Sequence, residues 1–344
     1  MTEPRILIVG AGAIGSVAGG LLAESGRDVT LVDQWPEHVE TIKAKGLRVS
    51  TRSSEHHVQV PALHIFELQS VAEPFDMAFI AVKSYDTEWA TRLAQGYVKP
   101  DGAFVDFQNG INDDRVAEIV GQERTLGCVI TISSGIYEPG KALRTDQNPW
   151  GFAIGELDGK ETPRAREIAD MMGAVAQASV TTNLWGERWS KLMINCMNNA
   201  LAGISGYGTA KVRTEPETRR IGIQLGAEVV RVARAHGQQV QGVMGISPDA
   251  MIDAAEGRNV EAVESQILEI ARLVGSGGRP SFLQDVLKKR RTEIEFLNGY
   301  VARKGEEKGV AMPFNRKITE IVTELGVGFE PDPAHIAPLS TMLP

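Results

Sequence analysis

A lysine and two asparagines recur at every fourth position of the chain, as Lys191, Asn195 and Asn199. They fall in segment 184–201, whose apolar pattern predicts a long helix. Over eight residues a helix rises about 12 Å and drifts only about 80° around its axis, so the three side chains form one polar stripe. The stripe is flanked by Leu192, Met193, Ile194, Cys196, Met197, Ala200 and Leu201. Polar groups in such apolar surroundings need partners, which either a bound polar substrate or an amide ladder between packed helices would supply.

A glycine-rich turn lies close to the N-terminus, where residues 10–15 read Gly-Ala-Gly-Ala-Ile-Gly. It directly follows an apolar run, 6–9, and directly precedes a predicted helix, 14–25. In such a turn the first glycine permits the tight bend, the second lets a pyrophosphate approach, and the third lets the helix pack on the strand. The N-terminus of the helix offers free N–H groups to phosphates. The pattern favours a dinucleotide site over a ligand-free turn or a methyltransferase loop. We expect the cofactor to be bound by Gly10, Gly12, Ala13, Ile14 and Gly15.

Three further polar residues follow predicted strands. Asp33 ends the second strand and can accept hydrogen bonds from both ribose hydroxyls of an adenosine. No basic residue follows it until Lys43, which favours NAD over NADP; the alternative is an ordinary acidic residue at a strand end. Lys83 and Asn109 follow later strands and should face the ligand, because ligands bind at the carboxyl ends of such strands. Asn109 precedes a glycine, so it could equally belong to a simple turn.

The first half of the chain alternates between apolar strands and helices. The predicted strands are 6–9, 29–32, 77–82, 103–107 and 125–130, and helices are expected at 14–25, 86–95 and 113–120. This alternation predicts an α/β fold, a doubly wound, mostly parallel sheet of the Rossmann type with helices on both faces. Segment 133–157 is broken by glycine and proline, and we expect short antiparallel strands there at the sheet edge.

The second half is predicted to be all-helical. Helices are expected at 184–201, 216–236, 260–274, 281–290, 292–307 and 314–325. We therefore divide the chain into a dinucleotide-binding domain, 1–182, and a helical substrate domain, 183–329. Residues 330–344 contain three prolines, and we expect a surface arm, a disordered tail or a segment that docks on a second subunit of a homodimer.

The composition excludes several classes of protein. The chain has 344 residues and a net charge of −8, which argues against nucleic-acid binding. Its hydrophobic fraction of 42% is ordinary for a globular protein, and no run of about 18 apolar residues predicts a membrane span. Only four residues precede the run from Arg5 to Val9, so we expect no signal peptide and a cytoplasmic location. Two cysteines cannot form a disulfide framework.

Several other features are better explained without chemistry. The basic run 288–291 would point all round a helix, so we expect it to be solvated. His56 and His57 have no further ligand at metal-binding spacing, and no metal site is predicted. Cys196 lies off the polar stripe and is expected to be a core thiol.

Taken together, the motifs resemble those of the ketopantoate reductases (2-dehydropantoate 2-reductases) over almost the whole chain. The motifs that carry the resemblance are residues 10–15, Ala81-Val82-Lys83, Gln108-Asn109-Gly110, Trp189 to Leu192 with Asn195 and Asn199, Ser281 to Asp285, and Thr292 to Glu295 with Asn298-Gly299. The resemblance implies a Rossmann domain, a helical domain and a cleft between them.

By the same resemblance, individual residues acquire roles. Lys191 is the general acid and Glu293 orients it or the substrate. Asn195 and Asn199 hydrogen-bond the substrate, and Ser281 meets the substrate carboxylate. Chemistry agrees with the first role, since a cation with a transferable proton stabilises the negative charge that grows on a ketone oxygen during hydride addition.

The chain also departs from the family pattern. Gly278 and Thr209 stand where family members often carry asparagines of the substrate pocket. Arg279 is a candidate replacement for a carboxylate contact. Asp33 departs as well, because the typical enzymes use NADP.

The sequence thus supports an NAD(P)-dependent oxidoreductase that reduces a 2-keto acid, such as ketopantoate, to a 2-hydroxy acid. One alternative is an NAD-dependent D-2-hydroxy-acid dehydrogenase that acts on a bulkier or aromatic substrate. An alternative of another class is a non-catalytic dinucleotide sensor. We expect a small 2-keto acid as the partner, with no nucleic acid and no membrane.

Overall fold

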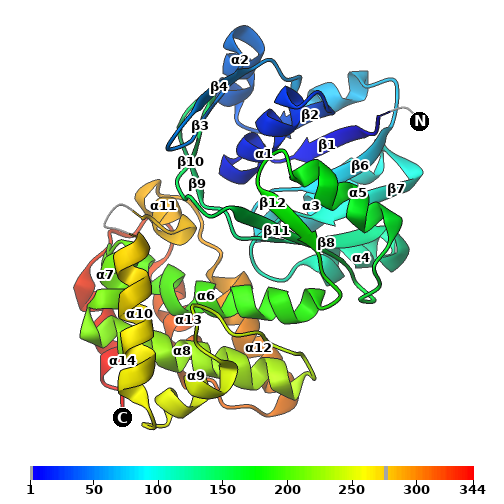
Figure 1. Ribbon diagram of the computed structural model, residues 1–344. Coiled ribbons are helices and arrows are strands. Elements are labelled where there is room, and N and C mark those ends of the chain that lie inside the picture. The colour runs from blue at the N-terminus through cyan, green and yellow to red at the C-terminus, as the bar shows by residue number, and fades with distance from the viewer. Residues whose placement is uncertain (1–2, 275–277) are drawn as a thin grey trace. The chain divides into compact units, whose positions relative to one another are not determined.

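The computed structural model describes residues 3–274 and 278–344 (Figure 1). Contacts along the chain divide it into two compact units, residues 1–184 and residues 185–344. The first unit is built on a large sheet and the second is helical, which confirms the predicted fold class.

The first unit holds an eight-stranded sheet. Its strands are β1 (Arg5–Val9), β2 (Asp28–Asp33), β5 (Ala62–His64), β6 (Phe75–Ile80), β7 (Val98–Asp106), β8 (Thr125–Ile130), β11 (Trp150–Glu156) and β12 (Gln177–Val180). They lie in the order β12-β11-β8-β7-β6-β1-β2-β5. All neighbours are parallel except β11 and β8, which are antiparallel. The carboxyl ends of β1, β2, β6 and β7 therefore meet at one edge of the sheet.

Helices cover both faces of this sheet. They are α1 (Ala13–Glu24), α2 (Pro36–Lys45), α3 (Thr87–Gln95), α4 (Asp113–Val120) and α5 (Pro163–Met172), with short 3-10 turns η1 (Ile65–Ser70), η2 (Ser84–Asp86) and η3 (Gln122–Arg124). Strand β1 alternates between the faces: Ile6 and Ile8 join the core with α1 and α5, whereas Leu7 and Val9 join the core with α3 and α4. A strand buried on both sides needs apolar residues at every position, which explains its continuous apolar run.

A second sheet has four strands. They are β3 (Leu47–Ser50), β4 (Glu55–Val58), β9 (Ser134–Glu138) and β10 (Lys141–Arg144), in the order β4-β3-β10-β9. Of the antiparallel strands expected within 133–157, β11 does join the main sheet, where it pairs with β8, whereas β9 and β10 pair with each other outside that sheet. Strands β9 and β10 join the β3–β4 hairpin, through parallel contacts between β10 and β3. Pairing between segments so far apart in sequence leaves no local pattern to predict it.

The second unit is helical throughout its described elements. These are α6 (Leu184–Ser205), α7 (Thr209–Thr214), α8 (Pro216–Ala235), α9 (Pro248–Ala255), α10 (Val260–Val274), α11 (Ser281–Leu287), α12 (Asn298–Lys308), α13 (Pro313–Leu325) and α14 (Ala337–Ser340), with 3-10 turns η4 (Ile294–Phe296) and η5 (Pro333–Ile336). Helix α8 lies close against α6, since a Cβ added at Gly222 would sit 3.1 Å from the carbonyl oxygen of Met197.

Two predicted helices are wrong in extent. The helix expected at 292–307 is divided into η4 and α12, because the backbone turns at Leu297 (φ −107°, ψ −96°). Apolar residues spaced by three and by four fit both arrangements, so the pattern does not reveal the break. The helix expected at 281–290 ends at Leu287, and Lys289 takes a left-handed conformation (φ +54°). The basic run 288–291 therefore lies outside a helix.

The C-terminal segment is not a free arm. The side chains of Ile336 and Leu339 are buried, and α14 packs against α8 and α13. The backbone N–H of Asp332 donates to the carbonyl oxygen of Ile204 at 2.8 Å. Of the arrangements expected for residues 330–344, the structure shows a surface segment that is ordered and anchored on its own unit, and not a disordered tail. Across the described residues, no helix is long and apolar enough to cross a membrane.

Candidate active site

The glycine turn has the backbone geometry that a dinucleotide site needs. Gly10 follows β1 with φ +103°, a conformation that favours glycine, and its N–H donates to the carbonyl oxygen of Val32 at 2.8 Å. A Cβ at Gly10 would lie 2.8 Å from the backbone of Ala81, so strand β6 approaches too closely for any side chain. A Cβ at Gly15 would lie 2.0 Å from the carbonyl oxygen of Gly10, so this glycine allows α1 to pack on the turn.

Gly12 differs from Gly10 and Gly15, because the space around its α-carbon is open. A Cβ added there meets no atom of the described residues within 4 Å. Gly12 is the N-cap of α1, offers no side-chain cap, and precedes a first turn without acidic residues. The N–H groups of Ala13 and Ile14 thus begin a helix with a free approach above the turn, which suits a pyrophosphate. The residues present therefore fit a dinucleotide.

Asp33 ends β2 and is half-buried. One of its oxygens, Oδ1, accepts the backbone N–H of Trp35 at 2.8 Å, which fixes the carboxylate at the strand end. Lys43, the first basic residue after Asp33, binds Glu67 at 2.7 Å and Glu40 at 3.1 Å. The hydrogen bond to Glu67 raises the pKa of Lys43. Its charge is thus matched by neighbouring carboxylates.

Lys83 and Asn109 lie on loops that follow adjacent strands. The hydroxyl of Ser84 donates to the carbonyl oxygen of Asn109 at 3.2 Å. Gln108 Nε2 donates to the carbonyl oxygen of Val82 at 2.8 Å. These bonds join the loops after β6 and β7, so Lys83 and Asn109 share the edge of the sheet that carries the glycine turn.

A buried histidine behind the glycine turn was missed by sequence reasoning. His38 of α2 is fully buried; its Nε2 lies 3.1 Å from the hydroxyl of Ser16, and its Nδ1 accepts the backbone N–H of Gly140 at 2.9 Å. The Ser16 hydroxyl in turn donates to the carbonyl oxygen of Ala11 inside the turn, at 2.7 Å. Burial lowers the pKa of His38. The ring also stacks on Trp35, with centroids 5.2 Å apart.

In the second unit, α6 carries the predicted polar stripe. Lys191 is half-buried, and the side chains of Asn195 and Asn199 are only 4% and 8% exposed. Asn195 Nδ2 is buried without a hydrogen-bond partner among the described residues. An amide donor left unpaired at this depth costs about 1–3 kcal/mol, so the position suits a ligand that accepts a hydrogen bond. An amide ladder between packed helices would have given this donor a partner.

Glu293, expected within the helix 292–307, lies instead at the N-cap of η4 and is only 4% exposed. The chain after η4 is anchored by Asn298, whose Nδ2 donates to Asn315 Oδ1 at 2.9 Å and reaches the carbonyl oxygen of Cys196 on α6 at 3.5 Å. The segment that bears Glu293 is therefore tied to the helix that bears the stripe.

Residues 278–281 pass the start of α7. The carbonyl oxygen of Gly278 accepts the backbone N–H of Thr209 at 2.9 Å, so the two positions that depart from the family pattern are neighbours. Arg279 is exposed. Pro280 occupies the N-cap of α11, and Ser281 is the first residue of this helix.

Cys196 is fully buried, and burial raises its pKa well above the ordinary value for a thiol. It is a core residue, as expected, and not a nucleophile. Within residues 3–274 and 278–344, no group of three or more histidine, cysteine, aspartate or glutamate side chains is arranged to hold a metal ion.

Two models of one protein family match the chain, one in each unit. Residues 6–159 match the model of ketopantoate reductase PanE/ApbA, and residues 183–326 match the model of its C-terminal part. The chain belongs to the ketopantoate reductase family. The predicted family and the predicted class of oxidoreductase are thereby confirmed.

Individual relatives extend over nearly the whole chain. A member of the ketopantoate reductase family from Archaeoglobus fulgidus, named 2-dehydropantoate 2-reductase, is 30% identical over 328 residues, or 94% of this chain and 98% of the relative. The solved structure of a PanE/ApbA family ketopantoate reductase from Ralstonia eutropha JMP134 is 26% identical, with a TM-score of 0.77 over 93% of this chain and 98% of that chain. D-mandelate dehydrogenase, solved with NADH and anilino(oxo)acetate, shares the fold with a TM-score of 0.78 at 23% identity, over 98% of this chain and 99% of that chain.

Proposed function

We propose that this protein reduces a ketopantoate-like 2-keto acid to the 2-hydroxy acid with a nicotinamide dinucleotide. The observation that carries the proposal is the stripe on α6, where a lysine is followed by a buried, unpaired amide at Asn195 in a chain of the ketopantoate reductase family. We assign cofactor binding to the glycine turn with Asp33 and Lys83, and substrate chemistry to the helical unit.

The proposed mechanism requires little of the side chains beyond proton transfer and alignment. When bound, the cofactor supplies a hydride to the carbonyl carbon. Lys191 donates a proton to the carbonyl oxygen as negative charge grows there, and so acts as the general acid. Asn195 and Asn199 hydrogen-bond the substrate, whose carboxylate is met by Ser281. Because Glu293 is almost fully buried, it can hold an ammonium or a substrate hydroxyl in a fixed direction.

Two other residues complete the proposed site. Asn109, beside Lys83, serves the nicotinamide half of the cofactor and the substrate. Arg279 is exposed and is assigned an auxiliary carboxylate contact. An unchanged KM for the 2-keto acid in the Arg279→Ala variant would remove Arg279 from the site.

We further propose a preference for NAD over NADP. Asp33 is held at the end of β2 by the N–H of Trp35, where its free oxygen can accept a ribose hydroxyl and would repel a 2′-phosphate. Lys43 cannot offset that repulsion, because Glu67 and Glu40 already hold its ammonium group.

A second candidate is an NAD-dependent D-2-hydroxy-acid dehydrogenase for a bulkier or aromatic substrate. The contact between Thr209 and Gly278 favours it, since the two amides that usually line the pocket are replaced side by side, and the glycine leaves more room than an asparagine would. The third candidate, a dinucleotide sensor, does not explain the stripe, because binding a dinucleotide alone requires neither a general acid nor substrate-binding amides on α6.

One experiment separates the three. Steady-state turnover is measured with ketopantoate and a panel of aliphatic and aromatic 2-keto acids, with NADH and NADPH in parallel. The main proposal predicts the highest kcat/KM for ketopantoate, and the second predicts it for a bulkier acid. Cofactor binding without turnover of any acid would contradict both and leave the sensor.

A further inference from the structure

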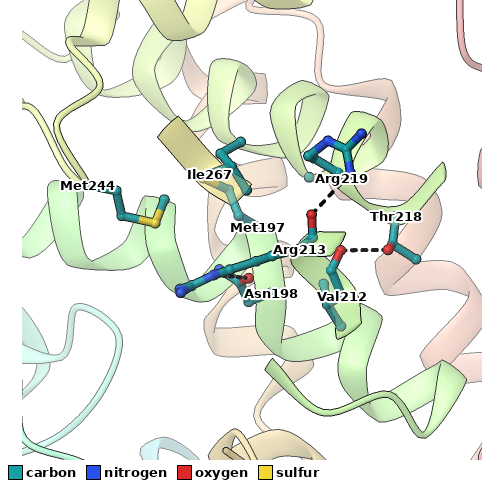
Figure 2. Close-up of a pocket in the computed structure, with 9 residues that line it drawn as sticks. Met197, Asn198, Val212, Arg213, Thr218, Arg219, Met244 and Ile267 are labelled. Carbon is teal, nitrogen blue, oxygen red and sulfur yellow. Dashed lines mark hydrogen bonds between the residues drawn. The ribbon is translucent and has the colours of Figure 1, made fainter. Parts of the chain in front are cut away.

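A small pocket inside the helical unit is separate from the stripe residues. Figure 2 shows its lining, which comes from α6, α7, α8 and α10 with one residue of the loop before α9. The lining residues are Met197, Asn198, Val212, Arg213, Thr218, Arg219, Gly222, Met244 and Ile267. Two arginines thus lie in a pocket whose other walls are largely apolar.

Arg219 has a carboxylate partner and backbone acceptors. Its Nη1 donates to the carbonyl oxygens of Arg213 and Thr214, at 3.3 and 2.9 Å, and so caps the end of α7. Its Nη2 lies 3.4 Å from Glu264, a carboxylate that also pairs with Arg220. This guanidinium therefore has both a structural role and a counter-charge.

Arg213, in contrast, has no carboxylate partner among the described residues. The side chain is only 8% exposed, and in Figure 2 it extends alongside Asn198, whose Oδ1 accepts its Nε–H at 3.2 Å. Over the described residues, no carboxylate lies within 4.0 Å of it, and its Nη1 is buried without a hydrogen-bond partner. Burial lowers the pKa of Arg213, yet a guanidinium stays charged in proteins. An unmatched buried charge is costly and needs a counter-ion.

The remaining polar groups of the pocket indicate that this counter-ion is an anion. Arg219 Nε is a second buried donor without a partner in the described structure. The side-chain oxygens of the lining belong to Asn198, whose Oδ1 already accepts the Nε–H of Arg213, and to Thr218, whose hydroxyl donates to the carbonyl oxygen of Val212 at 2.6 Å. Two buried N–H donors of the lining, Arg213 Nη1 and Arg219 Nε, thus have no partner, and an occupant that accepts hydrogen bonds would supply one. The cavity volume of about 10 Å³ has room for one occupant of roughly the size of a water molecule.

We propose that this pocket binds one small monovalent anion, of the size of a halide, which neutralises Arg213 and ties α7 to α6. Chloride is the physiological ion of this class. The site is independent of the reaction proposed above, because its lining includes none of the three stripe residues. Failure of one proposal leaves the other intact.

The test measures thermal unfolding of the full-length protein in sodium gluconate, with chloride or bromide exchanged for gluconate at constant ionic strength. We expect a saturable rise in Tm of about 3 °C, as for a ligand bound by the folded state alone. Arg213→Gln should lose the response. Arg220→Gln, which removes a neighbouring arginine outside the pocket lining, should keep it. Equal Tm values in chloride and gluconate, or an unchanged response in Arg213→Gln, would overturn the proposal.

A second measurement decides the matter if Arg213→Gln fails to fold. Crystals of the unaltered protein soaked in bromide should give an anomalous peak beside Arg213. Water density there without a bromide peak would overturn the proposal. So would a bromide peak without a saturable response in solution, which means an ion that binds at crystal concentration only.

Discussion

The imidazole of His38 lies 3.1 Å from the hydroxyl of Ser16, on the helix that begins in the glycine turn. Since Nδ1 of the same ring accepts the N–H of Gly140, the proton resides on Nε2 and is donated to Ser16. Ser16 then donates to the carbonyl oxygen of Ala11. The shape of the glycine turn thus depends on a neutral histidine from another helix.

Acid should weaken this arrangement. Burial lowers the pKa of His38 in the folded protein, so below the ordinary histidine value near 6.5 the unfolded chain takes up a proton that the folded protein resists. The stability that the neutral ring provides is complete above that value and is lost as the pH falls below it. We expect the free energy of unfolding of the wild type to fall between pH 7.5 and 5.5 by more than that of His38→Asn.

The same variant should also affect the cofactor. Asn can still accept the N–H of Gly140 but cannot reach Ser16, which loses one buried hydrogen bond worth about 1–3 kcal/mol. We expect KM for NADH to rise with kcat less affected, as measured by initial rates. A variant that lowers kcat and leaves the cofactor KM unchanged would argue against a role in shaping the turn.

Lys191→Ala tests the general acid. We expect kcat to fall by about 10³- to 10⁴-fold, because the developing oxyanion loses its proton donor, while the Kd for the cofactor stays within twofold. The matched control is Lys317→Ala on the exposed face of α13, which should leave kcat unchanged. Near-normal turnover by Lys191→Ala would remove Lys191 from the mechanism.

Asp33→Ser tests the cofactor preference. Removal of the carboxylate should lower kcat/KM for NADH and raise it for NADPH, so that the NADPH/NADH ratio rises by about 10-fold or more, the equivalent of about 1.4 kcal/mol. Lys43→Ala should leave the ratio unchanged, because Glu67 and Glu40 hold that lysine. A ratio that falls in Lys43→Ala would mean that Lys43 does serve a 2′-phosphate.

The paired substitutions Thr209→Asn and Gly278→Asn test substrate selection. Restoring both amides should lower KM for ketopantoate and reduce turnover of aromatic 2-keto acids, since a site gains discrimination from polar groups that a substrate must satisfy. Thr214→Asn at the exposed end of α7 is the control. An unchanged ratio of kcat/KM between the two kinds of acid would separate these positions from specificity.

The parts that sequence predicts well are those set by local pattern. The glycine turn and β1 could be predicted because backbone sterics and two-sided burial act within a few residues. The stripe of Lys191, Asn195 and Asn199 follows from helix geometry alone. The break at Leu297 could not be predicted, since residues 294, 297 and 301 face the core with or without it. His38 was missed because its partner Gly140 is 102 residues away, beyond any periodic signal.

The second sheet sets an order on the assembly of the N-terminal unit. Strand β3 finds its parallel partner only in β10, so the ribosome must pass Arg144 before the β3–β4 hairpin loses its open edge. Until then the nascent chain carries unpaired strand groups, the kind of surface that chaperones cover and that aggregates recruit. Closing so long a loop is also slow relative to the local contacts of the helical unit. Refolding from denaturant should therefore show helix formation in the second unit well before NADH binding returns.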